Sequence, residues 1–256
     1  MNPSTTLENR VPRIIFLYWV IKIASTTLGE TGADMFSMTF NLGYAETILI
    51  FMALFALMFA IKILQRGYHS IVYWITFTAT AIVGTAISDF IDRTLGWGYA
   101  WGSLFLVTVL LAVIFAWYLK EKSVCVERIV TRNAEVYYWL AFLVANTLGT
   151  AAGDFLADDL GLGFMNGALL ITGLLVVIAL LHYFTKVSGT LLFWLAFVLT
   201  RPFGATFGDF LTKSKEQGGI HFGTIGSSLV FGSILVIAVY LEHRMVIATK
   251  HRKTTE

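Results

Sequence analysis

The sequence is poor in charge, cysteine and proline. Only 13% of its 256 residues are charged, and 57% are hydrophobic. A soluble domain carries about 25% charged and about 45–50% apolar residues, and a soluble core of this size could not bury the excess. The single cysteine, Cys125, excludes a disulfide within the chain and a thiolate metal cage. The composition therefore indicates a protein that is solvated mainly by lipid.

Eight apolar stretches make up most of the chain, and none alternates polar with apolar residues. A helix needs about 20 apolar residues to span a bilayer, whereas a membrane β-barrel needs alternating strands. We therefore predict an all-α polytopic protein with about eight transmembrane helices in one membrane domain. We expect the first stretch to stay in the mature protein rather than to act as a cleaved signal peptide. The predicted spans are 14–29, 45–63, 71–87, 99–119, 137–153, 164–181, 191–207 and 222–241.

Basic residues near the ends of these spans are distributed unevenly. With eight spans, thirteen lie on the side of the N-terminus and three on the other side. Lys and Arg are enriched in cytoplasmic loops, so we expect both termini in the cytoplasm. The thirteen are Arg10, Arg13, Lys62, Arg66, Lys120, Lys122, Arg128, Arg132, Lys186, Arg244, Lys250, Arg252 and Lys253, and the three are Arg93, Lys213 and Lys215.

A motif recurs four times with constant spacing. Each copy has a Trp, a Gly ten residues later, and an Asp five residues after that Gly. Such regularity indicates an internal repeat, here of two helices. The motif residues are Trp19, Gly29 and Asp34; Trp74, Gly84 and Asp89; Trp139, Gly149 and Asp154; and Trp194, Gly204 and Asp209. A closing glycine follows nine residues after the Asp in three copies and five residues later than that in the fourth, at Gly43, Gly98, Gly163 and Gly223.

The four copies pair into two halves. Trp19 and Trp139 are 120 residues apart, and so are Trp74 and Trp194. We predict a first half, residues 1–122, with repeats at about 11–66 and 68–122, and a second half, residues 123–256, with repeats at about 131–186 and 188–245. Each repeat has an even number of spans, so the repeats are parallel rather than inverted.

This pattern resembles a family of bacterial inner-membrane proteins that is defined by tandem repeats of unknown function. Each repeat of that family has two transmembrane regions and a Trp, usually in four copies. The residues that carry the resemblance are 27–34 (TLGETGAD) and 201–209 (RPFGATFGD), with Lys213, Gly218 and Gly219. The resemblance covers nearly the whole chain and implies a multi-pass protein of the bacterial inner (plasma) membrane.

The four Asp lie about 22 Å along a helix from the Trp, in the half of the membrane far from the termini. Two interpretations remain open at this point: the carboxylates converge on a cation or proton, or they cap helix ends and pair with bases. Glu30 lies one turn before Asp34 on the same helix face. The predicted cation- or proton-binding residues are Asp34, Asp89, Asp154, Asp209 and Glu30, and the predicted charge-balancing residues are Arg201, Lys22 and Lys213.

The other motif residues have simpler expected roles. The motif glycines would let helices approach closely or unwind. The motif tryptophans would anchor or pack helices, with ligand contact as the alternative. If the acids bind a metal, their oxygen ligands favour Mg²⁺, Ca²⁺ or Mn²⁺. The predicted metal ligands are Glu30, Asp34 and Asp154. We expect no other cofactor.

Several function classes find no support in the sequence. It has no nucleotide-binding P-loop, no nucleophile elbow and no zinc-protease motif, so neither an enzyme nor an ATP-driven pump is expected. The leading hypothesis is a secondary transporter of a hard divalent cation, or a proton-coupled carrier. The alternatives are an exporter of small organic cations held by aromatic rings and a non-transporting scaffold or partner subunit. The expected partners are the lipid bilayer and a small cation, with a homo-oligomer left open and no nucleic acid.

Overall fold

The structure, a computed structural model, describes residues 9–65, 67–126 and 129–254, with side chains up to residue 249. This part of the chain is all-helical and has no strand, as predicted. Two of the basic residues used to predict orientation, Arg66 and Arg128, lie outside it. The helices are α1 (Phe16–Asp34), α2 (Tyr44–Leu64), α3 (Ser70–Asp89), α4 (Tyr99–Glu121), α5 (Arg132–Asp154), α6 (Gly163–Phe184), α7 (Gly189–Thr212) and α8 (Thr224–Thr254).

Seven of the eight helices are long and apolar enough to cross a membrane. The exception is α1, which carries Lys22, Glu30 and a run of Ser and Thr residues. It has 19 residues and lies inside the bundle against α3, α7 and α8, so its polar residues face protein rather than lipid. The number of helices is as predicted, and α1 overlaps the predicted span 14–29 although its polar residues set it apart from the other seven.

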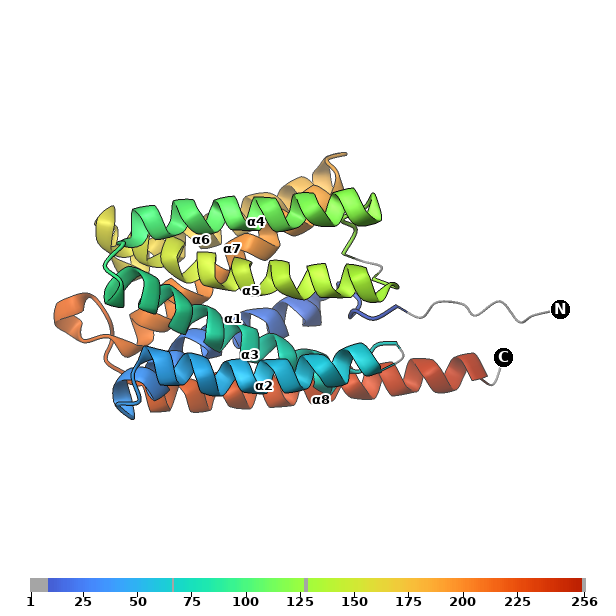
Figure 1. The fold of residues 1–256 in the computed structure, drawn as a ribbon, viewed down its shortest axis with the longest axis horizontal. Helices are drawn as coiled ribbons and strands as arrows, with labels where there is room; N and C mark the ends of the chain where they lie inside the picture. Colours follow the sequence, from blue (N-terminus) through green and yellow to red (C-terminus); the bar gives the residue numbers. More distant parts are fainter. Residues whose placement is uncertain (1–8, 66, 127–128, 255–256) are drawn as a thin grey trace.

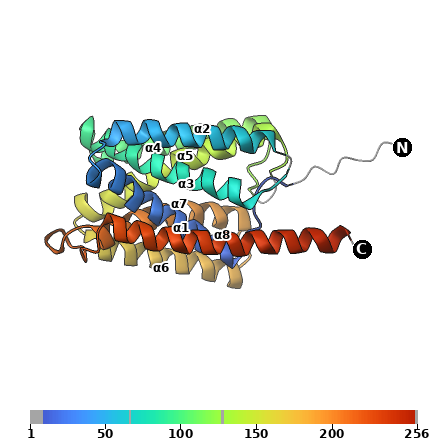
Figure 2. The same cartoon turned by 90° about the horizontal axis from the view of Figure 1, so that it is seen from below.

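Both ends of the described chain lie at the same end of the bundle, which we call the terminal end (Figures 1 and 2). The odd-numbered helices run from there to the opposite end, the far end, and the even-numbered helices return. Helix α8 continues past the other helices at the terminal end (Figure 1). The shared end for both termini follows from four repeats of two helices each.

The odd-numbered helices form a closed inner ring. Contacts join α1 to α3, α3 to α5, α5 to α7, and α7 back to α1. Each even-numbered helix packs outside the next odd one: α2 on α3, α4 on α5, α6 on α7, and α8 on α1. The most apolar windows of α3, α5 and α7 are 56–72% buried, against 17–22% for the even helices. The more apolar helices thus form the outer layer, where lipid would cover them.

The motif glycines are the joints of the inner ring. A Cβ atom at Gly29 would lie 2.6 Å from the Cβ of Ala81 on α3, and one at Gly84 would lie 2.9 Å from Asn146 on α5. The same contact recurs from α5 to α7 and from α7 back to α1, where Gly204 meets Thr26. The contacted residue is always three positions before the next glycine. Close approach, one of the two roles expected for these glycines, is the one observed.

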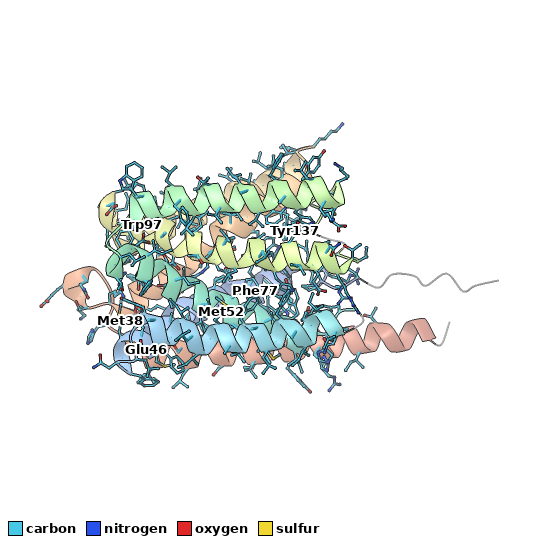
Figure 3. All side chains as sticks on the ribbon, in the orientation of Figure 1. Met38, Glu46, Met52, Phe77, Trp97 and Tyr137 are labelled. Atoms are coloured by element: carbon cyan, nitrogen blue, oxygen red, sulfur yellow. The ribbon has the colours of Figure 1, made fainter. Side chains whose placement is uncertain are left out.

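Repeats one to three share an ending that the sequence did not indicate. There, each odd helix continues from its motif Asp into a five-residue π-helical turn: η1 (Met35–Thr39), η2 (Phe90–Thr94) and η3 (Phe155–Asp159). Repeat four instead ends α7 at Thr212 and adds a short 3₁₀ turn, η4 (Lys215–Gln217), which a capping box of Ser214 and Gln217 closes. Met38 in η1 and Trp97 after η2 mark the far end in Figure 3.

Candidate functional site

The four motif aspartates lie inside the ring near the far end, and we call them the acid layer. Their side chains are buried, although each stands where an inner helix ends or nears its end. The members of the layer are Asp34, Asp89, Asp154 and Asp209. A buried carboxylate must be paired, protonated or coordinated, because transfer of an isolated charge out of water is very costly.

One basic side chain serves two of these carboxylates. The Nζ atom of Lys213 lies 2.7 Å from Oδ2 of Asp34 and 3.1 Å from Oδ1 of Asp209. Lys213 stands just past the end of α7, one turn after Asp209. Although burial opposes its charge, the carboxylates of Asp209 and Asp34 raise the pKa of Lys213 above its ordinary value. The charge-balancing role predicted for Lys213 agrees with this geometry.

Arg93 serves the other two carboxylates in the same way. Its Nε atom lies 3.2 Å from Oδ1 of Asp89, and its Nη2 atom lies 3.1 Å from Oδ2 of Asp154. Arg93 was predicted only to lie on the side of the membrane opposite the termini and was not predicted as a site residue. The missed signal was its position: it follows Asp89 by four residues, as Lys213 follows Asp209, and it precedes Lys213 by 120 residues.

Both bridges join the two homologous halves. Arg93, in the first half, binds Asp154 of the second half, and Lys213, in the second half, binds Asp34 of the first half. Among the described residues, the layer holds four carboxylates and these two bases as their salt-bridge partners. Two formal negative charges therefore have no matching positive charge within the layer.

The aspartates pair with bases, but their geometry agrees with neither the capping nor the metal interpretation. Asp34, Asp89 and Asp154 stand at the start of the π turns, but none of their side chains caps a backbone amide. Within the described residues, no three Asp, Glu, His or Cys side chains form a group able to hold a metal ion. The metal ligands predicted from sequence, Glu30, Asp34 and Asp154, thus do not come together as a coordination set.

A second polar cluster lies deeper in the ring and is centred on Arg201 of α7. Its Nη1 atom lies 3.3 Å from Oε2 of Glu30, and its Nη2 atom donates to the hydroxyls of Thr85 and Thr150. Glu30 accepts hydrogen bonds from both of these hydroxyls. Arg201 also donates to backbone carbonyls of α1 and α3. The guanidinium of repeat four thus binds the other three repeats at once.

Lys22 corrects one prediction, because it contacts no carboxylate in the described chain. Its Nζ atom donates to the carbonyl of Phe197, 2.8 Å away, and to the hydroxyl of Thr200. It lies 3.8 Å from the centre of the Phe197 ring and 5.7 Å from that of Phe77, which Figure 3 places inside the bundle. The other three repeats have Phe where the first has Lys22. The amine thus occupies an aromatic cage, rather than balancing the acid layer.

The terminal end is closed by two further links between the halves. Glu135 of α5 pairs with Lys62 at 2.9 Å and with Arg10. Glu242 of α8 accepts hydrogen bonds from Tyr68 and Trp74 at 2.7 and 2.8 Å. Neither glutamate was predicted as a site residue, because each occurs in one repeat only.

The motif tryptophans mainly pack helices together. Trp74 and Trp139 are each 1% exposed, while Trp19 and Trp194 are partly buried. The residue directly before each of these tryptophans is also aromatic and buried, and the hydroxyls of two of them, Tyr73 and Tyr138, lie 2.6 Å apart. Helix packing, rather than anchoring at the membrane surface, accounts for the buried pair.

These features define a multi-pass helical membrane protein built from internal repeats. Comparison with known families gives a match to the family described as Repeat of Unknown Function (DUF347), at residues 17–68, 72–123, 137–188 and 192–247. The matches cover most of the chain, which therefore belongs to this family. A search of curated proteins found no similar sequence, and a search of solved structures found no similar fold.

Proposed function

We propose that this protein is a proton-coupled secondary transporter and that the acid layer is its proton-binding site. The observation that carries this proposal is the charge of the layer, where four buried carboxylates share Arg93 and Lys213. Like charges disfavour one another's ionisation in a buried site, so protons can supply the missing positive charge. Lys213 keeps its own proton into the alkaline range, because its pKa is raised.

The links between the halves supply a route to alternating access. Arg93 and Lys213 hold the halves together at the far end, and Glu135 and Glu242 hold them together at the terminal end. Protonation of Asp34 and Asp154 removes the charge partner of each far-end bridge. The halves then part at that end while the terminal end stays closed. In alternating access, a carrier opens first at one end and then at the other, with the opposite end closed each time.

Two features weigh against the cation substrates that were expected from sequence. The guanidinium of Arg93 and the ammonium of Lys213 lie between the carboxylates that a divalent ion would have to bridge. The aromatic cage that could hold an organic cation is filled by Lys22. Protons therefore fit the acid layer better than either cation. We place the protein in the bacterial inner membrane with its termini in the cytoplasm, on the distribution of basic residues.

The test uses purified protein in liposomes that contain a pH-sensitive dye. A candidate solute is added under an imposed pH gradient, and coupled proton movement is recorded. We expect solute-dependent proton flux with the wild type and its loss with Asp34→Asn and Asp154→Asn. Asp158→Asn is the matched control, because Asp158 is exposed at the same end. Wild-type flux rates in folded Asp34→Asn and Asp154→Asn proteins would refute the proposal, as would a solute flux that is independent of the pH gradient.

A further inference from the structure

A groove of about 630 Å³ lies at the terminal half of the bundle, between α1, α6 and α7. It lies at a seam between the halves, because α1 belongs to the first half and the other two helices to the second. Its lining is mainly aliphatic, with the aromatic rings of Phe16, Trp19, Tyr183 and Phe193 among the aliphatic side chains. Among its lining residues are Phe16, Trp19, His182, Tyr183, Phe193 and Thr200. Its volume is in the range of small-molecule sites, about 300–1,000 Å³.

The repeat shows that this groove is one junction out of four. The residue nineteen positions after each closing glycine is Lys62, Trp117, His182 or Glu242. At three junctions this residue reaches the inner helix of the repeat after next. Lys62 pairs with Glu135 on α5, Trp117 contacts a ring on α7, and Glu242 binds an indole on α3.

The fourth junction is open. Here the corresponding residue is His182 on α6, and the inner helix is α1 with Trp19. Both residues line the groove, and no hydrogen bond or ring contact joins these two side chains. The repeat would place a contact here, as it does at the other three junctions. The equivalent junction between α3 and α8 also has an apolar groove, lined by Trp74, but it keeps its closing contact with Glu242. The missing contact, rather than the groove alone, sets the α1–α6 junction apart.

The groove reaches Thr200, which separates it from Lys22, the only basic side chain that is buried in the ring without an acidic partner among the described residues. Thr200 lines the groove, and its hydroxyl accepts a hydrogen bond from Lys22. Lys22 is fully buried, and its cage offers π faces, a carbonyl and a hydroxyl, but no counter-ion. A buried ammonium is costly unless an anion pairs with it. A ligand with a negatively charged group would supply the counter-ion that Lys22 lacks.

We propose that the groove binds a membrane-soluble carboxylic acid, with its apolar part along the apolar lining and its carboxyl group at Thr200 and Lys22. The acid donates its proton to the Lys22 amine, and the resulting carboxylate pairs with the ammonium. The O–H bond breaks, an N–H bond forms, and the pair as a whole stays neutral. The Trp19 indole, which lines the groove, is a further donor that suits a carboxylate. This inference rests on the proposed function, because it names the solute that the carrier would move with protons.

The test measures binding at equilibrium and needs no proton gradient. The probe is dansyl-undecanoic acid added to protein in detergent, with energy transfer from tryptophan to dansyl as the signal and undecanoic acid as competitor. We expect saturable binding that weakens at least tenfold in Lys22→Met and in Ala196→Trp, which fills the groove. Ile75→Trp is the control, because Ile75 lines a separate apolar groove between α2, α3 and α8. The corresponding dansyl amine should not bind saturably.

The outcomes separate the two proposals. Wild-type affinity in Ala196→Trp, or equal affinity for the amine, would overturn the site even if Lys22→Met fails to fold. Asp34→Asn should keep full binding, because the acid layer lies at the far end. If probe binding follows the expected pattern while liposomes show no proton flux, the site stands and the transport proposal falls. If flux is proton-coupled but the groove variants bind the probe like the wild type, the transport proposal stands and the groove site falls.

Discussion

Arg93 of the first half of the chain lies 3.1 Å from Asp154 of the second half, measured from Nη2 to Oδ2. The equivalent base, Lys213, returns the contact to Asp34 in the first half. Each half thus supplies one base and receives one. This reciprocity ties the stability of the far end to the same groups that would bind protons.

Removal of one partner of a far-end bridge should weaken the bundle. Arg93→Gln leaves Asp89 and Asp154 buried without a base, so we expect a loss of about 1–3 kcal/mol in the free energy of unfolding. Arg93→Gln combined with Asp154→Asn should cost less than the sum of the single changes, because the pair is coupled. Thermal unfolding in detergent measures this cycle. Lys215→Gln is the control, because Lys215 is exposed at the same end and its replacement should leave the unfolding temperature unchanged. If the effects of Arg93→Gln and Asp154→Asn simply add, the bridge between the two residues is contradicted.

The Arg201 cluster gives a stronger version of the same test. Glu30→Gln leaves a fully buried guanidinium without its carboxylate, and we expect a loss of about 3–5 kcal/mol. Glu30→Gln with Arg201→Met should recover part of that loss, because both charges are then gone. The measurement is the midpoint of thermal unfolding, with Arg244→Met on the exposed face of α8 as control. A double variant that is less stable than the sum of both single variants would argue against the pair.

The joints of the ring can be tested through their glycines. Gly29→Ala and Gly84→Ala place a Cβ within 3 Å of the next helix, so each should destabilise the protein by about 1–3 kcal/mol. Gly173→Ala is the matched control, since no atom lies within 4 Å of its Cβ position. Removal of a helical glycine should there stabilise by up to about 1 kcal/mol. Similar unfolding midpoints for all three variants would refute the close approach.

The orientation can be checked in cells. We expect tags at both termini to resist protease added to intact spheroplasts, because basic residues dominate the terminal end. A tag in the 213–219 loop, at the far end, should be cleaved under the same conditions. Cleavage of either terminal tag before lysis would reverse the assignment of sides.

Much of the fold could be predicted from the sequence because each repeat has the same pattern of apolar stretches and motif residues. Apolar stretches located all eight helices, including α1 with its buried Lys22, and the constant spacing of the motif grouped them into four repeats. The spacing also showed that the acids would share one level of the bundle. It indicated Lys213 as a base for these acids but not Arg93, although both stand four residues after a motif aspartate.

Other parts of the site depend on single departures from the repeat. Lys22 replaces a Phe of the other copies, so its neighbours follow only from the assembled ring. Glu135 and Glu242 likewise have no counterparts in other copies, and pattern reasoning passed over them. The π turns after three of the aspartates have no sequence signature that we recognise.

The contact of Gly204 with Thr26 closes the ring between the last inner helix and the first. Each joint is made from the same two positions, so the fold has no privileged first repeat. With both termini at one end, the order of repeats along the chain can be shifted without altering a single helix–helix contact. A circular permutant that begins in the connection between α4 and α5 should build the same bundle. The linear chain thus packs as a closed ring in which each repeat contacts the next in the same way.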